Sequence, residues 1–335
     1  MPGPERRPLG ARRGAAGALG VVLLFSSAAG AYCRTAVCPD GSPGEQCKPA
    51  RKTDCQIPLY WSKPCFGYSV QQDASAKVDW QTANGVATEA FAAWENVDCD
   101  GAGPNMHPVN LGPVACARHE YNQQGGNANV IVFRDADWPY GSSNALALTT
   151  VTYQLDTGEI FDADLEINSA TIPITTGDVG VQYDLLSIIT HEAGHFLGIA
   201  HAQDPKATMR TTYVMGETEL RSLEADDVAA VCAAYPPADP GPDAGACDPT
   251  PRHGFAKDCV DEPPPEEPGC QCAAAGRAGG SPPGALLLGL GALVASARLT
   301  RSRLLPVGSS GGRERGGTGK RSSAPEARAA AYSCT

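Results

Sequence analysis

The eleven residues from His191 to His201 read HEAGHFLGIAH, the pattern H-E-x-x-H-x-x-G-x-x-H. Residues four positions apart share one face of a helix, so the imidazoles of His191 and His195 can bind a single ion. Gly198 tolerates a positive φ, so the helix can end there and the chain can return His201 as a third ligand. Three histidines leave the fourth position of a zinc ion open for water, with Glu192 beside it as a base. The stretch therefore predicts a catalytic zinc site rather than three core or solvated histidines that match the pattern by chance.

A methionine follows the third histidine closely: Met209 lies eight residues after His201 and precedes Arg-Thr-Thr-Tyr. The whole pattern resembles the metzincin peptidases, and its spacing most resembles their matrixin branch, whose turn reads M-x-P-x-Y. The resemblance implies that Met209 forms an apolar floor under the imidazoles and is not a ligand. It also implies that the residues after it form the outer wall of the pocket for the residue after the scissile bond: Thr211, Thr212 and Tyr213. Two positions depart from the matrixin pattern, because Thr211 replaces a proline and Ala202 replaces a serine.

The resemblance covers roughly residues 65–236 and implies an α+β metzincin fold with a mixed twisted sheet, an active-site helix and a C-terminal helix. Residue patterns predict helices over 81–97, from about Tyr183, and over 223–235, and strands over 144–153 and 160–168. In metzincins the strand before the active-site helix lies at the sheet edge, where an extended peptide can pair as one more strand. The resemblance therefore assigns substrate binding to Leu146, Ala147 and Leu148.

Two other groups of residues are candidate metal ligands. His107 and His119 lie where matrixins usually carry a second, structural zinc, but they lack the expected H-G-D context and are interpreted as surface or core histidines. Five carboxylates can hold calcium, since hard oxygen ligands suit that ion: Asp156, Glu159, Asp162, Asp164 and Glu166. No EF-hand-like spacing supports calcium, so solvated charges on a strand face are the favoured interpretation.

Residues 1–31 have the pattern of a secretory signal peptide. Four arginines precede a short apolar core over residues 15–28, and Ala29-Gly30-Ala31 forms an A-x-A cleavage site. This core is too short to span a membrane stably. The sequence therefore predicts a secreted or cell-surface protein.

The cysteines agree with export, because ten of the thirteen, an even number, fall between Cys33 and Cys259. Residues 32–64 form a cysteine-rich N-terminal segment, too rich in proline and glycine to build its own core, so disulfides are expected to shape it. The sequence leaves the pairing open. A latency switch through the thiolate of Cys38 is the alternative, since Cys38-Pro39-Asp40 faintly resembles a matrixin prosegment, but a disulfide is favoured.

The composition changes after the predicted catalytic domain. Residues 237–268 are rich in proline and acidic residues and predict an extended linker, with Cys247 and Cys259 as its staple. Residues 269–303 combine Gly-Cys-x-Cys, a short apolar stretch and arginines, which resembles the C-terminal sorting tag of myxobacterial surface proteins and implies anchoring at the cell envelope. Residues 304–335 form a low-complexity tail.

These patterns together predict an exported zinc endopeptidase that acts on polypeptides. The net charge of −11 argues against a nucleic-acid partner. Zinc would activate a water and polarise the scissile carbonyl, while Glu192 takes the proton and delivers it to the leaving amine. The alternative is a surface-anchored binding or adhesion protein on a protease-like scaffold, but a binder has no use for the base Glu192.

Overall fold

A mixed six-stranded sheet forms the frame of the α+β fold. The computed structural model describes residues 3, 32–47, 55–140, 145–238, 247–260 and 327–334. The strand order in the sheet is β11-β7-β8-β6-β4-β5. These strands are β4 (Cys65–Gln71), β5 (His107–Val114), β6 (Val130–Phe133), β7 (Ala147–Gln154), β8 (Ile160–Ile167) and β11 (Ala327–Cys334). The pairs among β5, β4, β6 and β8 are parallel, whereas β7 is antiparallel to both β8 and β11.

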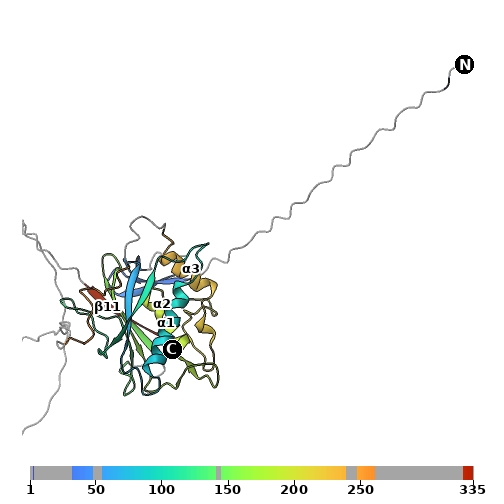
Figure 1. Ribbon diagram of the computed structural model, residues 1–335. Helices are drawn as coiled ribbons and strands as arrows, with labels where there is room; N and C mark the ends of the chain where they lie inside the picture. The colour runs from blue at the N-terminus through green and yellow to red at the C-terminus, as the bar shows by residue number, and fades with distance from the viewer. Residues whose placement is uncertain are drawn as a thin grey trace, which may run out of the picture.

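Two helices, α1 (Trp80–Glu95) and α2 (Leu185–Phe196), pack against each other and against this sheet (Figure 1). An aspartate caps each of them, which satisfies backbone donors that the first turn leaves unpaired. Asp79 accepts from the backbone N–H of Thr82 at 3.0 Å, and Asp184 accepts from that of Ser187 at 2.9 Å. A short 3₁₀ turn (Glu219–Arg221) and α3 (Ala225–Ala234) follow, and a small parallel pair, β9 (Ile174–Thr175) and β10 (Tyr183–Asp184), precedes α2.

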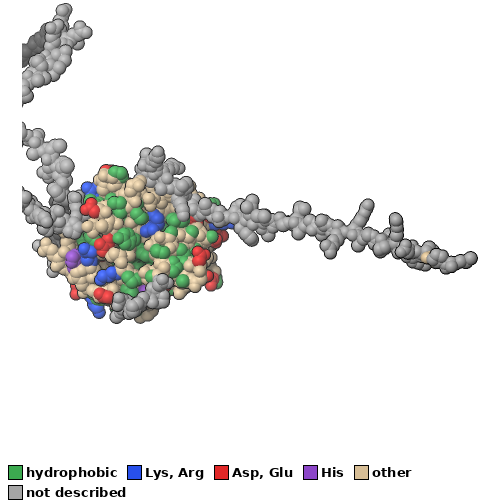
Figure 2. Space-filling view, turned by 90° about the horizontal axis from the view of Figure 1, so that it is seen from above, with side chains coloured by type: hydrophobic (Ala, Val, Ile, Leu, Met, Phe, Trp, Pro, Cys, Tyr) green, Lys and Arg blue, Asp and Glu red, His purple; other side chains and the backbone are tan. Residues whose placement is uncertain are grey.

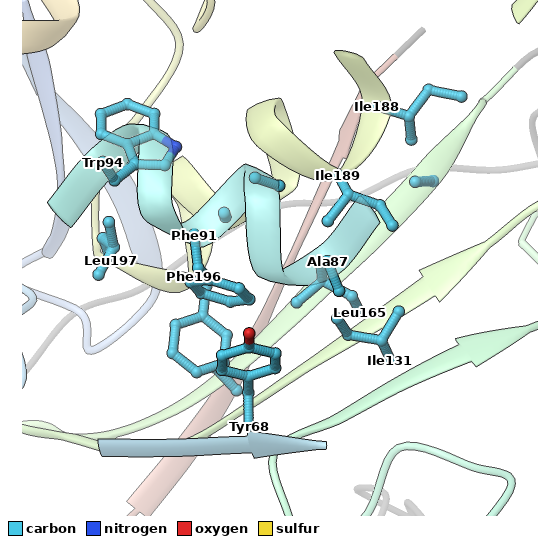
Figure 3. Close-up of a cluster of buried hydrophobic side chains, with 14 of the residues drawn as sticks. Tyr68, Ala87, Phe91, Trp94, Ile131, Leu165, Ile188, Ile189, Phe196 and Leu197 are labelled. Atoms are coloured by element: carbon cyan, nitrogen blue, oxygen red, sulfur yellow. The ribbon is translucent and has the colours of Figure 1, made fainter. Parts of the chain in front are cut away.

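Aromatic side chains join the helices to the sheet in the core (Figure 3). Tyr68 of β4 stacks on Phe91 of α1 with 4.2 Å between ring centroids, and Phe91 meets Phe196 of α2 edge-on at 5.1 Å. Trp94 donates from its indole N–H to the carbonyl of Thr190 at 2.8 Å. Large buried rings contribute much of the packing energy. The hydrogen bond from the Trp94 indole joins α1 to α2 directly before the histidine motif and helps to fix the distance between the two helices.

The cysteine-rich N-terminal segment is joined to the rest of the domain. Its strands are β1 (Cys33–Val37), β2 (Pro43–Cys47) and β3 (Ile57–Pro58), and its disulfides are Cys33–Cys47 and Cys38–Cys55. The backbone N–H of Thr35 donates to the carbonyl of Gly198 at 3.0 Å, and that of Ala200 donates to the carbonyl of Cys33 at 3.1 Å. The segment thus pairs with the loop after α2. Because Cys38 is bonded to Cys55, it does not supply the thiolate of a latency switch in this structure.

The linker predicted over residues 237–268 is corrected for residues 247–260. Cys247 and Cys259 are not bonded to each other, since the disulfides are Cys65–Cys247 and Cys116–Cys259. The segment also pairs with the domain through its backbone: the N–H groups of Ala115 and Asn127 donate to the carbonyls of Lys257 and Gly254, at 2.7 and 2.8 Å. Two covalent bonds and a backbone ladder hold it against the domain, although its proline-rich composition is typical of a linker.

Two predicted segments lie outside the described residues: the signal peptide apart from Gly3, and the sorting segment over 269–303. Among the residues that are described, no helix has both the length and the apolar character needed to cross a membrane. The face drawn in Figure 2 carries acidic and basic side chains interspersed with apolar ones. Within the predicted low-complexity tail, residues 327–334 form the strand β11.

Candidate metal centre

Helix α2 supplies the first two histidines and the glutamate. His191, Glu192 and His195 are fully buried on this helix. The helix ends at Phe196, and Gly198 follows with φ +76°. A Cβ at Gly198 would stand 2.5 Å from the carbonyl oxygen of Leu59, so glycine is required both by the turn and by the close approach of the backbone. This turn returns the chain so that His201 faces the helix, as the motif predicts.

The three imidazoles converge. One ligand atom from each histidine lies within 4.8 Å of the others, and the Nε2 atoms of His195 and His201 are 3.3 Å apart. Their rings meet at centroid distances of 4.7–5.4 Å. Nε2 of His191 is buried and has no hydrogen-bond partner among the described residues. A buried nitrogen left without a partner is costly, and a metal ion at the centre of the cluster would satisfy it.

The opposite ring nitrogens are held by oxygen atoms. Nδ1 of His191 lies 2.7 Å from the carbonyl of Thr208, and Nδ1 of His195 lies 2.9 Å from that of Ile199. A carbonyl only accepts, so each Nδ1 carries its hydrogen and each Nε2 keeps a lone pair for a metal. Nδ1 of His201 lies 3.4 Å from a carboxylate oxygen of Glu45 on β2.

Burial favours the metal-binding form of the imidazoles. It lowers the pKa of His191 to about 3, and it also lowers the pKa of His195. Metals bind the neutral imidazole. With three imidazole nitrogens in a small cluster, the residues present fit zinc in a site that keeps one position open.

Met209 lies beneath the helix at the predicted place. It is 1% exposed, and a Cβ added to Gly194 of α2 would stand 2.2 Å from its sulfur. Its turn is held by α3, because the carboxylate of Asp227 accepts from the backbone N–H groups of Thr208 and Met209 at 2.7 and 3.0 Å. Asp227 lies in the helix predicted over 223–235, but its role in the methionine turn depends on the packing of α3.

The carboxylate of Glu192 receives a hydrogen bond from another element of the fold. The hydroxyl of Thr149 on β7 donates to Oε2 of Glu192 at 2.5 Å, and both side chains are fully buried. Sequence reasoning missed Thr149, because it lies 43 residues before Glu192 in a strand whose neighbours are also threonines. The bond holds one oxygen of the carboxylate and orients the group beside the histidines.

The residues predicted to bind substrate are placed differently from the expectation. Leu146, Ala147 and Leu148 are buried, and β7 is not an edge strand, because it pairs with β8 on one side and β11 on the other. In the segment after Met209, which was predicted to form the outer wall of the pocket, Thr211 and Thr212 are exposed. Tyr213 is 8% exposed, and its hydroxyl accepts from the backbone N–H of Asp184 at 3.0 Å and donates to the carbonyl of Glu217. Tyr213 therefore anchors this segment to the start of α2.

Three of the carboxylates interpreted as solvated are buried, which corrects that interpretation. They are Asp162, Asp164 and Glu166, at 2%, 1% and 0% exposure. Burial raises the pKa of Asp162, and it raises that of Asp164 to about 7. The alternation of polar residues along β8 predicted that one face of this strand is exposed to solvent. Residues of the 115–135 region cover that face instead. Asp164 accepts from the backbone N–H groups of Glu120 and Val130 at 2.9 and 2.7 Å.

The two other histidines stand apart from the cluster. His107 lies 3.1 Å from Glu95, and His119 lies 3.0 Å from Glu166. Glu166 also binds Arg134 and the hydroxyl of Tyr140. These contacts pair each of the two histidines with a glutamate, away from the cluster.

Comparison with known proteins agrees with the fold and the cluster. Residues 110–236 match the family model for matrixin. A stretch of 61 residues is 39% identical to neutrophil collagenase of Homo sapiens, and it covers 18% of this chain and 13% of that protein. The chain thus spans about an eighth of the length of this relative. Residues 110–236 are therefore a matrixin-like domain with a metzincin-type α+β fold, and the family is one of zinc metallopeptidases. The match includes the histidines, Met209 and α3, but not Glu45.

Proposed function

We propose that this chain is an exported zinc endopeptidase in which Glu192 acts as the general base. The observation that carries the proposal is the convergence of three buried imidazoles, with a glutamate beside them and their opposite ring nitrogens held by oxygen atoms. Such second partners fix the tautomer and orientation of metal-binding histidines.

Each residue then has a defined task. His191, His195 and His201 would hold the ion, which when bound polarises a carbonyl and lowers the pKa of water. The carboxylate of Glu192 accepts the proton of the attacking water and delivers it to the leaving nitrogen. Thr149 holds the carboxylate in place for both transfers. Met209 supports the histidines from below without contacting the substrate.

Export and substrate class are part of the same proposal. The described residues contain five disulfides, which are typical of an oxidising compartment and agree with the signal peptide predicted over residues 1–31. We infer that the substrate is an extended polypeptide that pairs with β7, and that residues 269–303 hold the protein at the cell envelope. Thr211 and Thr212 are exposed on the segment proposed to face the residue after the scissile bond.

The direct test is hydrolysis of casein by the purified, zinc-loaded chain, with and without a chelator. Glu192→Ala keeps all three imidazoles, so zinc stoichiometry should stay at one while hydrolysis falls by roughly 10²-fold or more. His201→Ala should instead lower zinc occupancy sharply, because two imidazoles make a weak site. Undiminished hydrolysis by zinc-loaded Glu192→Ala would contradict the proposal. If neither the full chain nor a form without residues 327–335, which include the strand paired with β7, hydrolyses casein although zinc is bound, a binding protein is favoured.

A further inference from the structure

The strand β11 covers the open side of β7 along its full length. The antiparallel register runs from Ala327 opposite Gln154 to Cys334 opposite Ala147. Figure 1 shows β11, in red, at the end of the sheet. Without β11, β7 would be the last strand, and its outward N–H and C=O groups would be open to another extended chain.

The covered part of β7 is the part nearest the histidine cluster. Tyr332 lies opposite Thr149, the residue whose hydroxyl binds Glu192. The Cα atoms of β11 also come within 8 Å of those of α2. The end of β11 therefore passes beside the helix that carries the proposed general base.

The beginning of β11 is held by the N-terminal segment. Arg328 lies opposite Tyr153, and a side chain added at Gly41 would meet its guanidinium group at 3.5 Å. The pKa of Asp40 is lowered, mainly by hydrogen bonds from Ser42 and also by the charge of Arg328. The disulfide Cys38–Cys55 fixes the turn that presents Asp40. Arg328, at one end of the strand, thus lies beside Gly41 and the charge of Asp40, whereas the strand sequence, ARAAAYSC, has few large side chains.

Such a strand resembles a bound peptide in its interactions. In β-augmentation, the backbone ladder supplies most of the affinity and an extended segment of almost any sequence can occupy the edge. Residues 327–334 are rich in alanine and make such a ladder with the strand on which we place substrate binding. One edge accepts one strand, so β11 and a substrate exclude each other.

We propose that residues 327–334 are an intramolecular competitor that occupies the peptide-binding edge of β7 and keeps the cleft closed to polypeptides. This inference rests on the proposed function, because it names the segment that regulates the same site. Removal of the strand exposes the edge, and cleavage of the chain before residue 327 would release it.

The first test measures the ladder and needs no catalysis. Hydrogen exchange of the β7 amides is compared in a Glu192→Ala background, where self-cleavage cannot remove the strand. Deletion of residues 327–335 should speed exchange of the outward-facing amides of residues 147–154, since these lose their partners. The double substitution Ala329→Pro with Ala330→Pro should do the same, because proline has no backbone N–H to donate. Two adjacent positions are changed because neighbouring N–H groups of a strand point to opposite edges, so that one of the two faces β7. Ala329→Val with Ala330→Val keeps every N–H and should leave exchange unchanged. A matched deletion of nine residues, 309–317, controls for chain length.

The second test measures competition in the zinc-loaded chain. If the edge is open in about a tenth of the molecules or fewer, deletion of residues 327–335 should lower KM for a long peptide by about tenfold or more, with kcat little changed. A synthetic peptide of residues 327–334 should then inhibit the deleted form competitively. In this peptide Cys334→Ser is used, so that inhibition reports strand pairing and not a thiol on the metal.

The outcomes separate this inference from the proposed function. Faster exchange with no hydrolysis by any form would support the strand pairing and contradict the peptidase. Hydrolysis with equal KM in the full and deleted chains, and equal exchange of β7, would overturn the competitor while leaving the peptidase intact.

Discussion

A carboxylate oxygen of Glu45 lies 3.4 Å from Nδ1 of His201, so a residue of the N-terminal hairpin contacts the last histidine of the cluster. The disulfide Cys33–Cys47 and the backbone bonds of β1 to the loop after α2 hold the hairpin there. The segment that precedes the matrixin-like domain is therefore part of the candidate metal centre.

Glu45→Gln should weaken zinc binding without unfolding the chain. Partners of the second ring nitrogen typically change metal affinity by about 10- to 100-fold, and the side chain of Glu45 is 42% exposed, so we expect about tenfold. Competition with a chromophoric chelator measures the affinity. Glu89→Gln, which removes an exposed carboxylate on α1, is the control for net charge and should bind zinc as the unchanged chain does. Equal affinity in all three would show that Glu45 is a bystander.

Thr149→Val should reduce turnover while zinc remains bound. The substitution keeps the shape of the buried side chain but removes the donor to Glu192. A hydrogen bond to a charged group contributes about 1.5–3 kcal/mol, so kcat should fall by about tenfold or more, with KM changed less. Steady-state kinetics on a peptide, with zinc content measured in parallel, tests this. Thr150→Val changes the adjacent residue on the other face of the strand and should retain normal turnover.

Gly194→Ala should destabilise the domain, although alanine favours helices. A Cβ at this position would stand 2.2 Å from the sulfur of Met209 and 2.8 Å from the ring of Trp94, so α2 must move away from the methionine turn. Overpacking of this kind costs about 1–3 kcal/mol, which urea unfolding can measure. Gly85→Ala is the matched control, since nothing lies within 4 Å of a Cβ there. It should leave stability unchanged or raise it by up to about 1 kcal/mol. Equal stability of the two variants would show that the turn gives way easily.

Asp162→Asn should stabilise the protein progressively as pH rises from about 5 to about 8. Burial raises the pKa of Asp162 and Asp164, the latter to about 7, against about 3.9 for an unfolded aspartate. A raised pKa means that the folded state holds the proton, so the stability from this pair is present below about pH 4 and is lost as pH rises through about 7. The asparagine has no charge to lose. Relative to the unchanged chain, the variant should therefore gain stability between pH 5 and pH 8 in urea unfolding.

Two comparisons complete this test. Asp156→Asn, at an exposed carboxylate before β8, should show no such gain. The measurements are made in the presence of a calcium chelator and repeated with calcium. Stabilisation of the unchanged chain by calcium, absent in Asp162→Asn, would assign the pair to a calcium ion instead of a shared proton.

Local patterns in the sequence were enough to predict the helices and the histidine cluster. The spacing of His191 and His195 places them on one face of a helix whatever surrounds it, and the glycine turn that returns His201 is also local. The even number of cysteines between Cys33 and Cys259 predicted disulfides from composition and compartment alone. The α+β class followed from the resemblance of the motif and its surroundings to the matrixins.

Only the tertiary structure decided which distant residues complete the site. Glu45, Thr149 and Asp227 look like ordinary polar residues in the sequence, and no period connects them to the histidines. The disulfide partners of Cys247 and Cys259 and the burial of Asp162 were likewise decided by which surfaces pack together. The position of β7 next to β11 is the clearest case. A strand pattern specifies an extended segment with two faces. The strand that pairs with its edge is chosen by contacts between residues far apart in the chain, such as Ala147 and its partner Cys334, which are 187 positions apart.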